Sequence, residues 1–285
     1  MRFTAALAAS LLALAPAAAF AQDGDGNAPE GSKLDGDYLV VGAGGIYGPS
    51  YEGSDDQVFS PIPMVQGRLG GVGINPRPGG VGLDLIPDGK DAKVGLQFGP
   101  VATYSGNRHR QIKDPVVRAA GKLKEAIDVG FNAGFTVYDL LNDYDSLTFS
   151  ADAKWNVNKA YRGTVITPQM SYQTPLSKGA LLVVGANLKH VDDDYADYYY
   201  SVTPGQSAAT GGVLPVYQAK GGWVGYGGTA LLGYDLDGDL TNGGLSLFAV
   251  ANYTRLMGDA KRTPYTSLRG SANQWTVGGG VAYTF

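Results

Sequence analysis

A histidine that acts as a catalytic base in this chain would have to be one of two, His109 and His190. His190 is closely followed by the acidic run Asp192–Asp194, and a His–Asp pair could activate a hydroxyl nucleophile, as in hydrolases. The simpler interpretation is a surface histidine in a solvated acidic loop. His109 lies in a basic loop where it could contact a lipid phosphate, or it could be an ordinary loop residue. Because no complete catalytic constellation is present, we expect a protein that is not an enzyme.

Metal and cofactor sites are also expected to be absent. The segments Asp23–Asn27 and Asp235–Asp239 carry acidic or amide residues at every second position, which is how a calcium-binding loop begins. Both lack the glycine that such a loop needs at its sixth position, which Ala28 and Leu240 occupy, so we interpret both as solvated turns. The chain has no cysteine, and its glycine-rich pieces are not followed by the Gly-Lys-Ser/Thr of a phosphate loop.

The overall composition suits a membrane barrel better than a nucleic-acid-binding protein. The 22 basic and 26 acidic residues give a net charge of −4, so no basic stripe is available to neutralise phosphates. The 285 residues include 43 glycines and 18 tyrosines. Such levels favour curved strands and the aromatic girdles found at membrane interfaces.

Five charged residues alternate with apolar neighbours and would face the inside of a barrel: Lys93, Asp128, Asp152, Lys154 and Lys189. They could line a narrow selective pore, or they could be the polar packing that a barrel interior needs. Asp152 and Lys154 are two positions apart on one face, so we expect them to pair with each other or with a neighbouring strand. We favour a plugged or very narrow lumen over an open one.

The strands that must position these charges show the alternation of a membrane barrel. In residues 127–138 and 147–157, apolar side chains alternate strictly with polar or small ones. Each run is about 11 residues long, which is what a tilted strand needs to cross the hydrocarbon core. The last stretch, residues 272–285, alternates in the same way, with Trp275, Tyr283 and Phe285 on its apolar face. A closing strand that ends in an aromatic residue resembles the carboxy-terminal assembly signal of bacterial outer-membrane barrels.

The whole chain divides into three predicted parts. Residues 1–21 have the early charge, apolar run and small-residue end of a secretory signal peptide. We expect residues 22–36 to be a flexible periplasmic leader and residues 37–285 to be one barrel. Pro61 and Pro63 lie on one face of a predicted strand and indicate a local distortion, because proline is normally confined to edges and irregular positions.

The strand number depends on the segment Gly70–Ile86, which is either one bulged strand or a short hairpin. With this segment counted as one strand the clear strands number eleven, and closure with both termini in the periplasm needs an even number, so we favour the hairpin. We therefore predict an all-β, antiparallel, up-and-down transmembrane barrel of about 12 strands, with 10–14 possible. The long connections 105–124, 191–221 and 257–271 then lie outside the cell.

A family resemblance supports this prediction. The segment PSYEGSDD, followed by Pro61-Ile62-Pro63, resembles the N-terminal pattern of the MipA/OmpV outer-membrane proteins. The motif residues are Pro49, Tyr51, Glu52, Gly53 and Ser54. The resemblance implies an integral protein of the Gram-negative outer membrane. It also implies possible partners, since members of the family are described as scaffolds for a lytic transglycosylase and a murein synthase, and others as adhesins or surface antigens.

Four functions therefore stay open. The first is a non-enzymatic scaffold that links the outer membrane to murein enzymes, with outer-membrane lipid and the barrel-assembly machinery as general partners. Its candidate contacts are the leader and the turns Leu140–Asp145 and Asp235–Asn242. The alternatives are a narrow channel for small solutes, a surface adhesin, and a hydrolase that uses His190 at the barrel rim. No motif corresponds residue by residue to a partner-binding site.

Overall fold

The computed structural model describes residues 31–89 and 92–285, and in this part of the chain twelve antiparallel strands form a closed barrel. Each strand pairs with its neighbours in sequence, and β1 pairs with β12 to close the wall. The strands are β1 Tyr38–Pro49, β2 Gln57–Leu69, β3 Val72–Arg77, β4 Gly80–Asp84, β5 Val94–Ser105, β6 Ala126–Tyr138, β7 Ser146–Asn156, β8 Thr164–Ser177, β9 Ala180–Val191, β10 Gly222–Asp235, β11 Gly244–Leu256 and β12 Asn273–Thr284. The predicted twelve-strand barrel is confirmed, because the ambiguous segment forms the hairpin β3–β4. The predicted signal peptide and the segment Asp23–Asn27 lie outside the described residues.

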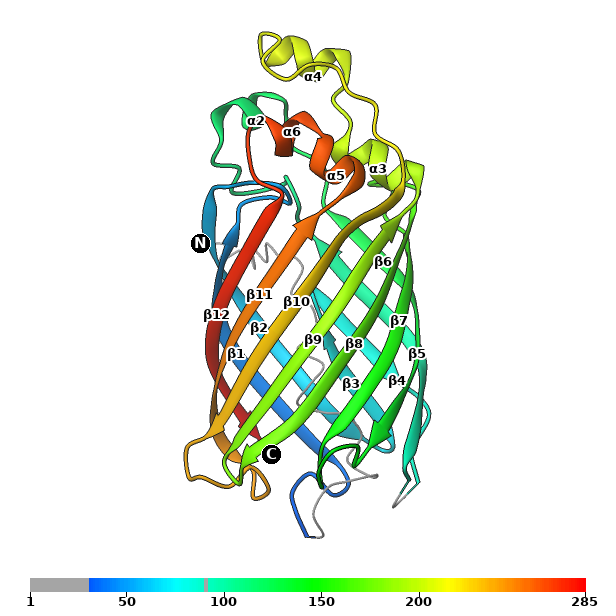
Figure 1. The fold of residues 1–285 in the computed structure, drawn as a ribbon, viewed down its shortest axis with the longest axis vertical. Coiled ribbons are helices and arrows are strands. Elements are labelled where there is room, and N and C mark those ends of the chain that lie inside the picture. The colour runs from blue at the N-terminus through cyan, green and yellow to red at the C-terminus, as the bar shows by residue number, and fades with distance from the viewer. Residues whose placement is uncertain (1–30, 90–91) are drawn as a thin grey trace, which may run out of the picture.

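All helices of the described chain gather at one end of the barrel, which we call the loop end (Figure 1). They are α2 Pro115–Ala119, α3 Asp193–Tyr200, α4 Pro204–Ala209, α5 Gly258–Arg262 and α6 Pro264–Ser267. The opposite end, where the C-terminus and short turns lie, we call the turn end. The long connections 105–124, 191–221 and 257–271 thus contain short helices. Within the described residues, no helix has the length and apolar character that a membrane crossing requires.

Alternation along each strand produces an apolar outer wall and a buried inner face. On β5 and β6, the outward-facing Phe98 and Phe131 are exposed, and their rings stack at 6.0 Å between centroids. Their strand neighbours Gln97 and Asn132 point inward and are buried. An apolar outer surface over the height of the wall is what a bilayer requires of a spanning barrel.

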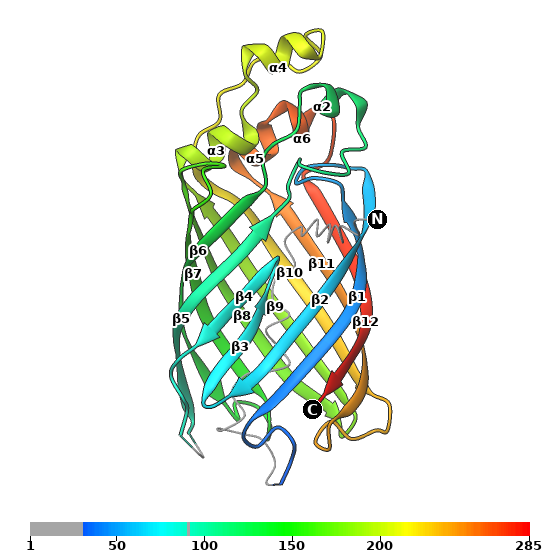
Figure 2. The ribbon, with the colours of Figure 1, turned by 180° about the vertical axis from the view of Figure 1, so that it is seen from behind.

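One seam in the wall is only partly paired, where β2 meets the short β3 (Figure 2). Among the described residues, β2 pairs with β3 only through Gly67–Leu69. Residues 57–66 therefore have no paired strand on that side. The Leu39 carbonyl accepts a hydrogen bond from the Phe285 N–H, at the end of β12. The backbone N–H and C=O groups of odd-numbered β1 residues therefore point toward β12, and those of even-numbered residues bond to β2. Pro61 and Pro63 pair in register with odd-numbered β1 residues, so the side on which they lack an N–H is the free one. The distortion predicted from these prolines is therefore an unpaired edge, where proline removes no ladder hydrogen bond.

The loop end is covered by a cap built from four connections. Tyr51, Val117, Leu214 and Tyr265, from four different connections, pack with Ile112, Ala120 and Val202 into one buried apolar cluster. Arg108 is buried among them, with its guanidinium 3.8 Å from the centre of the Tyr265 ring and one nitrogen donating to the Tyr199 carbonyl at 3.2 Å. Burial lowers the pKa of the Arg108 guanidinium. The cap therefore has a core of its own and does not consist of separate solvated loops.

Candidate functional site

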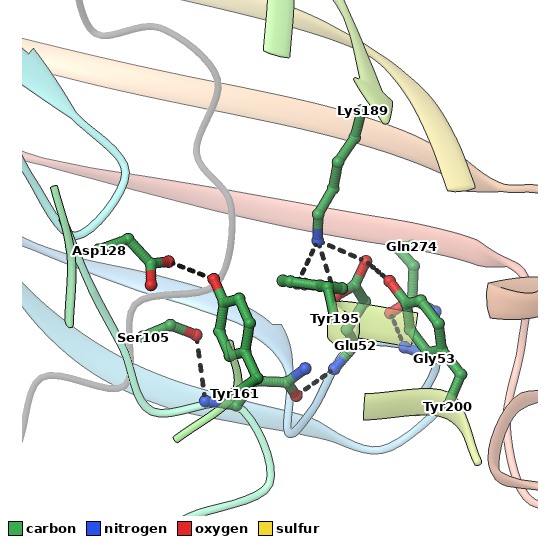
Figure 3. A network of polar contacts seen from close by, with 10 residues as sticks. Glu52, Gly53, Ser105, Asp128, Tyr161, Lys189, Tyr195, Tyr200 and Gln274 are labelled. Atoms are coloured by element: carbon green, nitrogen blue, oxygen red, sulfur yellow. Dashed lines mark hydrogen bonds and ion pairs between the residues drawn. The ribbon is translucent and has the colours of Figure 1, made fainter. Parts of the chain in front are cut away.

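An ion pair crosses the lumen beneath the cap and joins the β1–β2 connection to β9 (Figure 3). The Lys189 amino group donates to both carboxylate oxygens of Glu52, at 3.1 and 3.0 Å, and to the Tyr195 hydroxyl at 2.8 Å. The Tyr200 hydroxyl donates to the same carboxylate at 3.1 Å. Both charged side chains are mostly buried, with exposed fractions of 22% for Lys189 and 16% for Glu52. Two residues that the sequence presented separately, one in the family motif and one among the inward charges, are thus brought together.

Local geometry explains why the motif residues hold Glu52 in this position. Gly53 has a φ of +101°, a left-handed conformation that strongly favours glycine, and a Cβ there would lie 2.2 Å from the Thr266 hydroxyl. The Gly53 N–H donates to the Gln274 side chain at 3.0 Å, and the Glu52 N–H donates to Asn107 at 3.0 Å. The motif therefore folds the β1–β2 connection inward across the barrel mouth.

A second ion pair lies deeper in the lumen and corrects one prediction. Asp152 is buried and accepts hydrogen bonds from Arg77 at 3.1 Å and from Asn132 at 2.7 Å. We expected Asp152 to pair with Lys154 or with a neighbouring strand. The hydrogen bond from Asn132 does come from the neighbouring β6, but the cationic partner Arg77 comes from β3, four strands away around the wall. Sequence reasoning missed Arg77 because it lies in the segment whose strand structure was undecided. Lys154 lines a cavity together with Arg77 and Asp152, and the negative charges of Asp152 and Asp128 attract its amino group.

The other predicted inward charges have different positions. Asp128 points inward from β6 and accepts hydrogen bonds from the Tyr161 hydroxyl at 2.7 Å and from Asn156 at 3.0 Å. Lys93 precedes β5 at the turn end, where it pairs with Asp139 at 2.7 Å. The Lys93 side chain is 73% exposed, so this residue lies outside the lumen and our expectation for it was wrong. The alternation was correct, but Lys93 lies just before Val94, the first residue of the strand.

The formal charges of the upper lumen, by which we mean its loop-end half, balance around a small cavity of about 160 Å³. Its charged lining residues are Arg77, Lys154, Lys189, Glu52, Asp128 and Asp152. The Glu52–Lys189 and Arg77–Asp152 contacts each join distant strands or connections across the barrel interior. Such cross-lumen contacts tie distant parts of the wall together.

The two histidines are engaged in other contacts. His190 packs its ring edge-to-face against Trp223 at 5.1 Å. Asp192, its expected acidic partner, instead caps α3 by accepting from the Tyr195 N–H at 3.0 Å. His109 contacts the Leu123 carbonyl at 2.7 Å and Glu125 at 2.8 Å. In the part of the chain that the structure describes, no cluster of three potential metal ligands occurs.

At the turn end, a rigid turn between β6 and β7 presents an apolar side chain. The buried Asp145 carboxylate accepts hydrogen bonds from the N–H groups of Leu140, Leu141 and Asn142, at 2.6, 3.0 and 3.1 Å. It also accepts from the Tyr172 hydroxyl at 2.6 Å. Burial alone raises the pKa of Asp145, but these hydrogen bonds outweigh it and hold the pKa below its usual value. Leu141 at the tip of this turn is 77% exposed.

The second predicted contact turn, between β10 and β11, also has internal order. Asp235, Asp237 and Asp239 each accept a hydrogen bond from the N–H two residues later, at 3.0 to 3.1 Å. The alternating acidic residues that resembled a calcium loop thus form successive turns. On the closing strand, Trp275, Tyr283 and Phe285 all point outward and are exposed.

Comparison with known proteins decides the family. Residues 41–285 match the family described as MltA-interacting protein MipA. The chain belongs to the MipA family. Relatives of this MipA-family chain include the outer membrane protein Omp26La of Vibrio anguillarum and the outer membrane protein OmpV of Vibrio cholerae. Each is 31% identical over 191 residues, which cover 67% of this chain and 66% of the relative, just under two thirds of its length.

Solved structures give more distant matches to this MipA-family chain. The COG4313 outer membrane channel from Pseudomonas putida F1 is 14% identical with a TM-score of 0.46, and the match covers 93% of this chain and 100% of that one. A Pseudomonas aeruginosa FadL homologue is 10% identical with a TM-score of 0.32, over 87% of this chain and 89% of that one.

Proposed function

We propose that this MipA-family protein is an integral outer-membrane barrel that anchors a cell-wall enzyme at its turn end without catalysing a reaction itself. The observation that carries the proposal is the family match over residues 41–285, because the family is described by its interaction with MltA. Relatives named as outer membrane proteins support the location. In this proposal both termini and the turn end face the periplasm, where cell-wall enzymes act.

The geometry favours the turn end as the docking surface. The loop end is covered by the cap, and beneath it the Glu52–Lys189 pair occupies the lumen. At the turn end, hydrogen bonds to Asp145 hold Leu141 in an exposed position before any partner arrives. A preorganised apolar side chain costs little conformational entropy on binding, which is a property of effective interface residues.

Affinity capture with a matched pair of variants tests the proposal. Tagged protein is purified from solubilised envelopes, and captured proteins are identified by mass spectrometry. The wild type should recover a murein hydrolase or synthase, and Leu141→Asp should recover much less of it. Val216→Asp, which places the same charge at an exposed apolar position of the loop end, should behave as wild type. Capture of no murein enzyme by the wild type would contradict the anchor function.

A further inference from the structure

The turn-end half of the lumen contains an apolar chamber of about 630 Å³ that the anchor function does not use. Its deep lining comes from inward-facing residues of β1, β2, β9, β11 and β12: Val40, Met64, Leu181, Phe248 and Ala282. The volume lies within the range of about 300–1,000 Å³ that is usual for small-molecule sites. The chamber is therefore large enough for a ligand.

An apolar lining is unusual at this position, because the interior of a transmembrane barrel is normally polar. The upper lumen of this protein follows the rule, with three cations and three anions around its cavity. In the turn-end half, Phe248 and Met64 belong to one buried apolar cluster, and Leu181, Val183 and Leu231 belong to another. Water in such a space makes few hydrogen bonds, so an apolar guest that displaces it is favoured.

Two glycines give the chamber its space. A Cβ at Gly280 would lie 2.8 Å from the end of the Phe248 ring, and a Cβ at Gly42 would lie 3.0 Å from the terminal methyl group of Met64. Because both positions lack a side chain, the ring and the thioether lie against the wall and leave the centre open. Met64 is also flexible, so it can adapt to guests of different shape.

The mouth of the chamber is polar and its edges are fixed. The Lys33 N–H donates to the Thr241 carbonyl at 2.7 Å, and the Leu240 N–H donates to the Lys178 carbonyl at 2.9 Å, so three segments are tied together there. Asp145, Lys178 and Asp239 line the outer part of the chamber, whereas its deep apolar part offers few hydrogen-bonding groups. A matching guest therefore carries its polar atoms at one end only.

We propose that the turn-end chamber binds one single-chain amphiphile, with its alkyl chain inside the lumen and its polar head at the mouth beside Lys178. This inference goes beyond the anchor function and does not depend on it. The chain's own residues 22–30, QDGDGNAPE, are a poor alternative guest because almost all of them are polar or glycine.

Photolabelling in a bilayer tests the proposal. The protein is reconstituted in phosphatidylcholine nanodiscs with dodecanoic acid that carries a diazirine near the end of its chain. After illumination, labelled residues are mapped by peptide mass spectrometry. Labels should appear on lumen-facing Met64 and Phe248, and excess unlabelled dodecanoic acid or lysophosphatidylcholine should remove them. Labels on bilayer-facing residues such as Leu232, which is exposed on the outer wall, should persist, because the membrane is not saturated.

The competitors distinguish the source of the chain. Loss of the lumen label with dodecanoic acid alone identifies a fatty acid site, and loss with both identifies a site for any single-chain amphiphile. Absence of lumen labels while Leu232 is labelled, or lumen labels that no competitor removes, would overturn the proposal.

A matched pair of variants locates the label. Ala282→Trp places a large ring in the chamber and should abolish labelling of Met64, whereas Ala249→Trp, which faces the bilayer, should leave it unchanged. If Ala282→Trp does not fold, as judged by heat-modifiable migration in gel electrophoresis, Leu181→Trp fills the same space from β9. Labelling of Met64 that survives a folded chamber-filling variant would contradict the assignment.

Discussion

Neutralising Glu52 while keeping its shape tests whether the cross-lumen ion pair holds the loop end together. In Glu52→Gln, the Lys189 amino group keeps the Tyr195 hydroxyl at 2.8 Å, and its cation–π contact with the Tyr195 ring at 4.8 Å. It loses the carboxylate that accepted two of its hydrogen bonds. A mostly buried ammonium group is then left without a counter-charge.

The structure sets the size of the effect. Removing one partner of a fully buried ion pair costs about 3–5 kcal/mol, whereas an exposed pair contributes about 0.2–1 kcal/mol. Because Lys189 and Glu52 retain 22% and 16% exposure, water screens part of the unpaired charge. We therefore expect Glu52→Gln to lower the free energy of unfolding by about 2 kcal/mol. Replacing both partners, in Glu52→Gln with Lys189→Met, should cost less than the two single changes summed, because no unpaired charge remains.

Urea unfolding of the four proteins in lipid vesicles, followed by tryptophan fluorescence, measures this cycle. Trp223 and Trp275 lie near the loop end and report on it directly. Lys93→Met is the control, because Lys93 belongs to an exposed pair and should change stability by less than about 1 kcal/mol. Single-variant effects that add without coupling would refute the conclusion that Glu52 and Lys189 act as a pair.

Three further predictions concern other parts of the barrel. Asp145→Ala should lower the free energy of unfolding by about 2 kcal/mol, since it leaves three partly buried backbone hydrogen bonds without their charged acceptor. The pKa of Asp145 is lowered in the folded state, so its contribution is present at neutral pH and is lost as the pH falls through that lowered pKa. The free energy of unfolding of the wild type should therefore exceed that of the variant by a constant amount near neutral pH and converge with it only in this acid range, and curves that stay parallel throughout would contradict the prediction. In planar bilayers the wild type should show little conductance, whereas Glu52→Ala with Lys189→Ala should show larger steps; equal conductance would mean that the pair does not restrict the lumen. Deleting Phe285 should slow assembly into the outer membrane, as measured by the fraction of folded protein in envelopes, whereas deletion with no effect would remove its role as an assembly signal.

The features that the sequence predicted are those that follow from neighbouring residues. Alternation along residues 127–138 and 147–157 identified β6 and β7, because inward and outward positions succeed each other every second residue. The even strand number required by closure then favoured dividing Gly70–Ile86 into a hairpin, as the structure has it. The order of Asp145 and its turn could not be inferred, because it depends on a hydrogen bond from Tyr172, 27 residues away.

The candidate site was harder to predict, because its pairs are distant in sequence. Lys189 and Glu52 are 137 residues apart, and Arg77 and Asp152 are 75 apart. Alternation places a side chain on a face of the wall, but it does not determine which residue it meets across the lumen. The apolar chamber escaped detection for the same reason. Its members, such as Met64 and Phe248, lie on distant strands and resemble ordinary core residues when each strand is considered alone.

The unpaired stretch of β2 has a consequence for how barrels meet in a crowded membrane. Open strand edges invite pairing with another chain, and such pairing would join neighbouring molecules into a continuous sheet. A strand from another molecule that approached the free edge of β2 would find no N–H at Pro61 or Pro63. Both positions point toward that edge, where a new β-ladder would need hydrogen-bond donors. Phe59, which is 64% exposed beside them, adds a bulky ring to the outer side. The free edge of β2 therefore disfavours strand pairing between molecules, although the barrel wall is incompletely paired there.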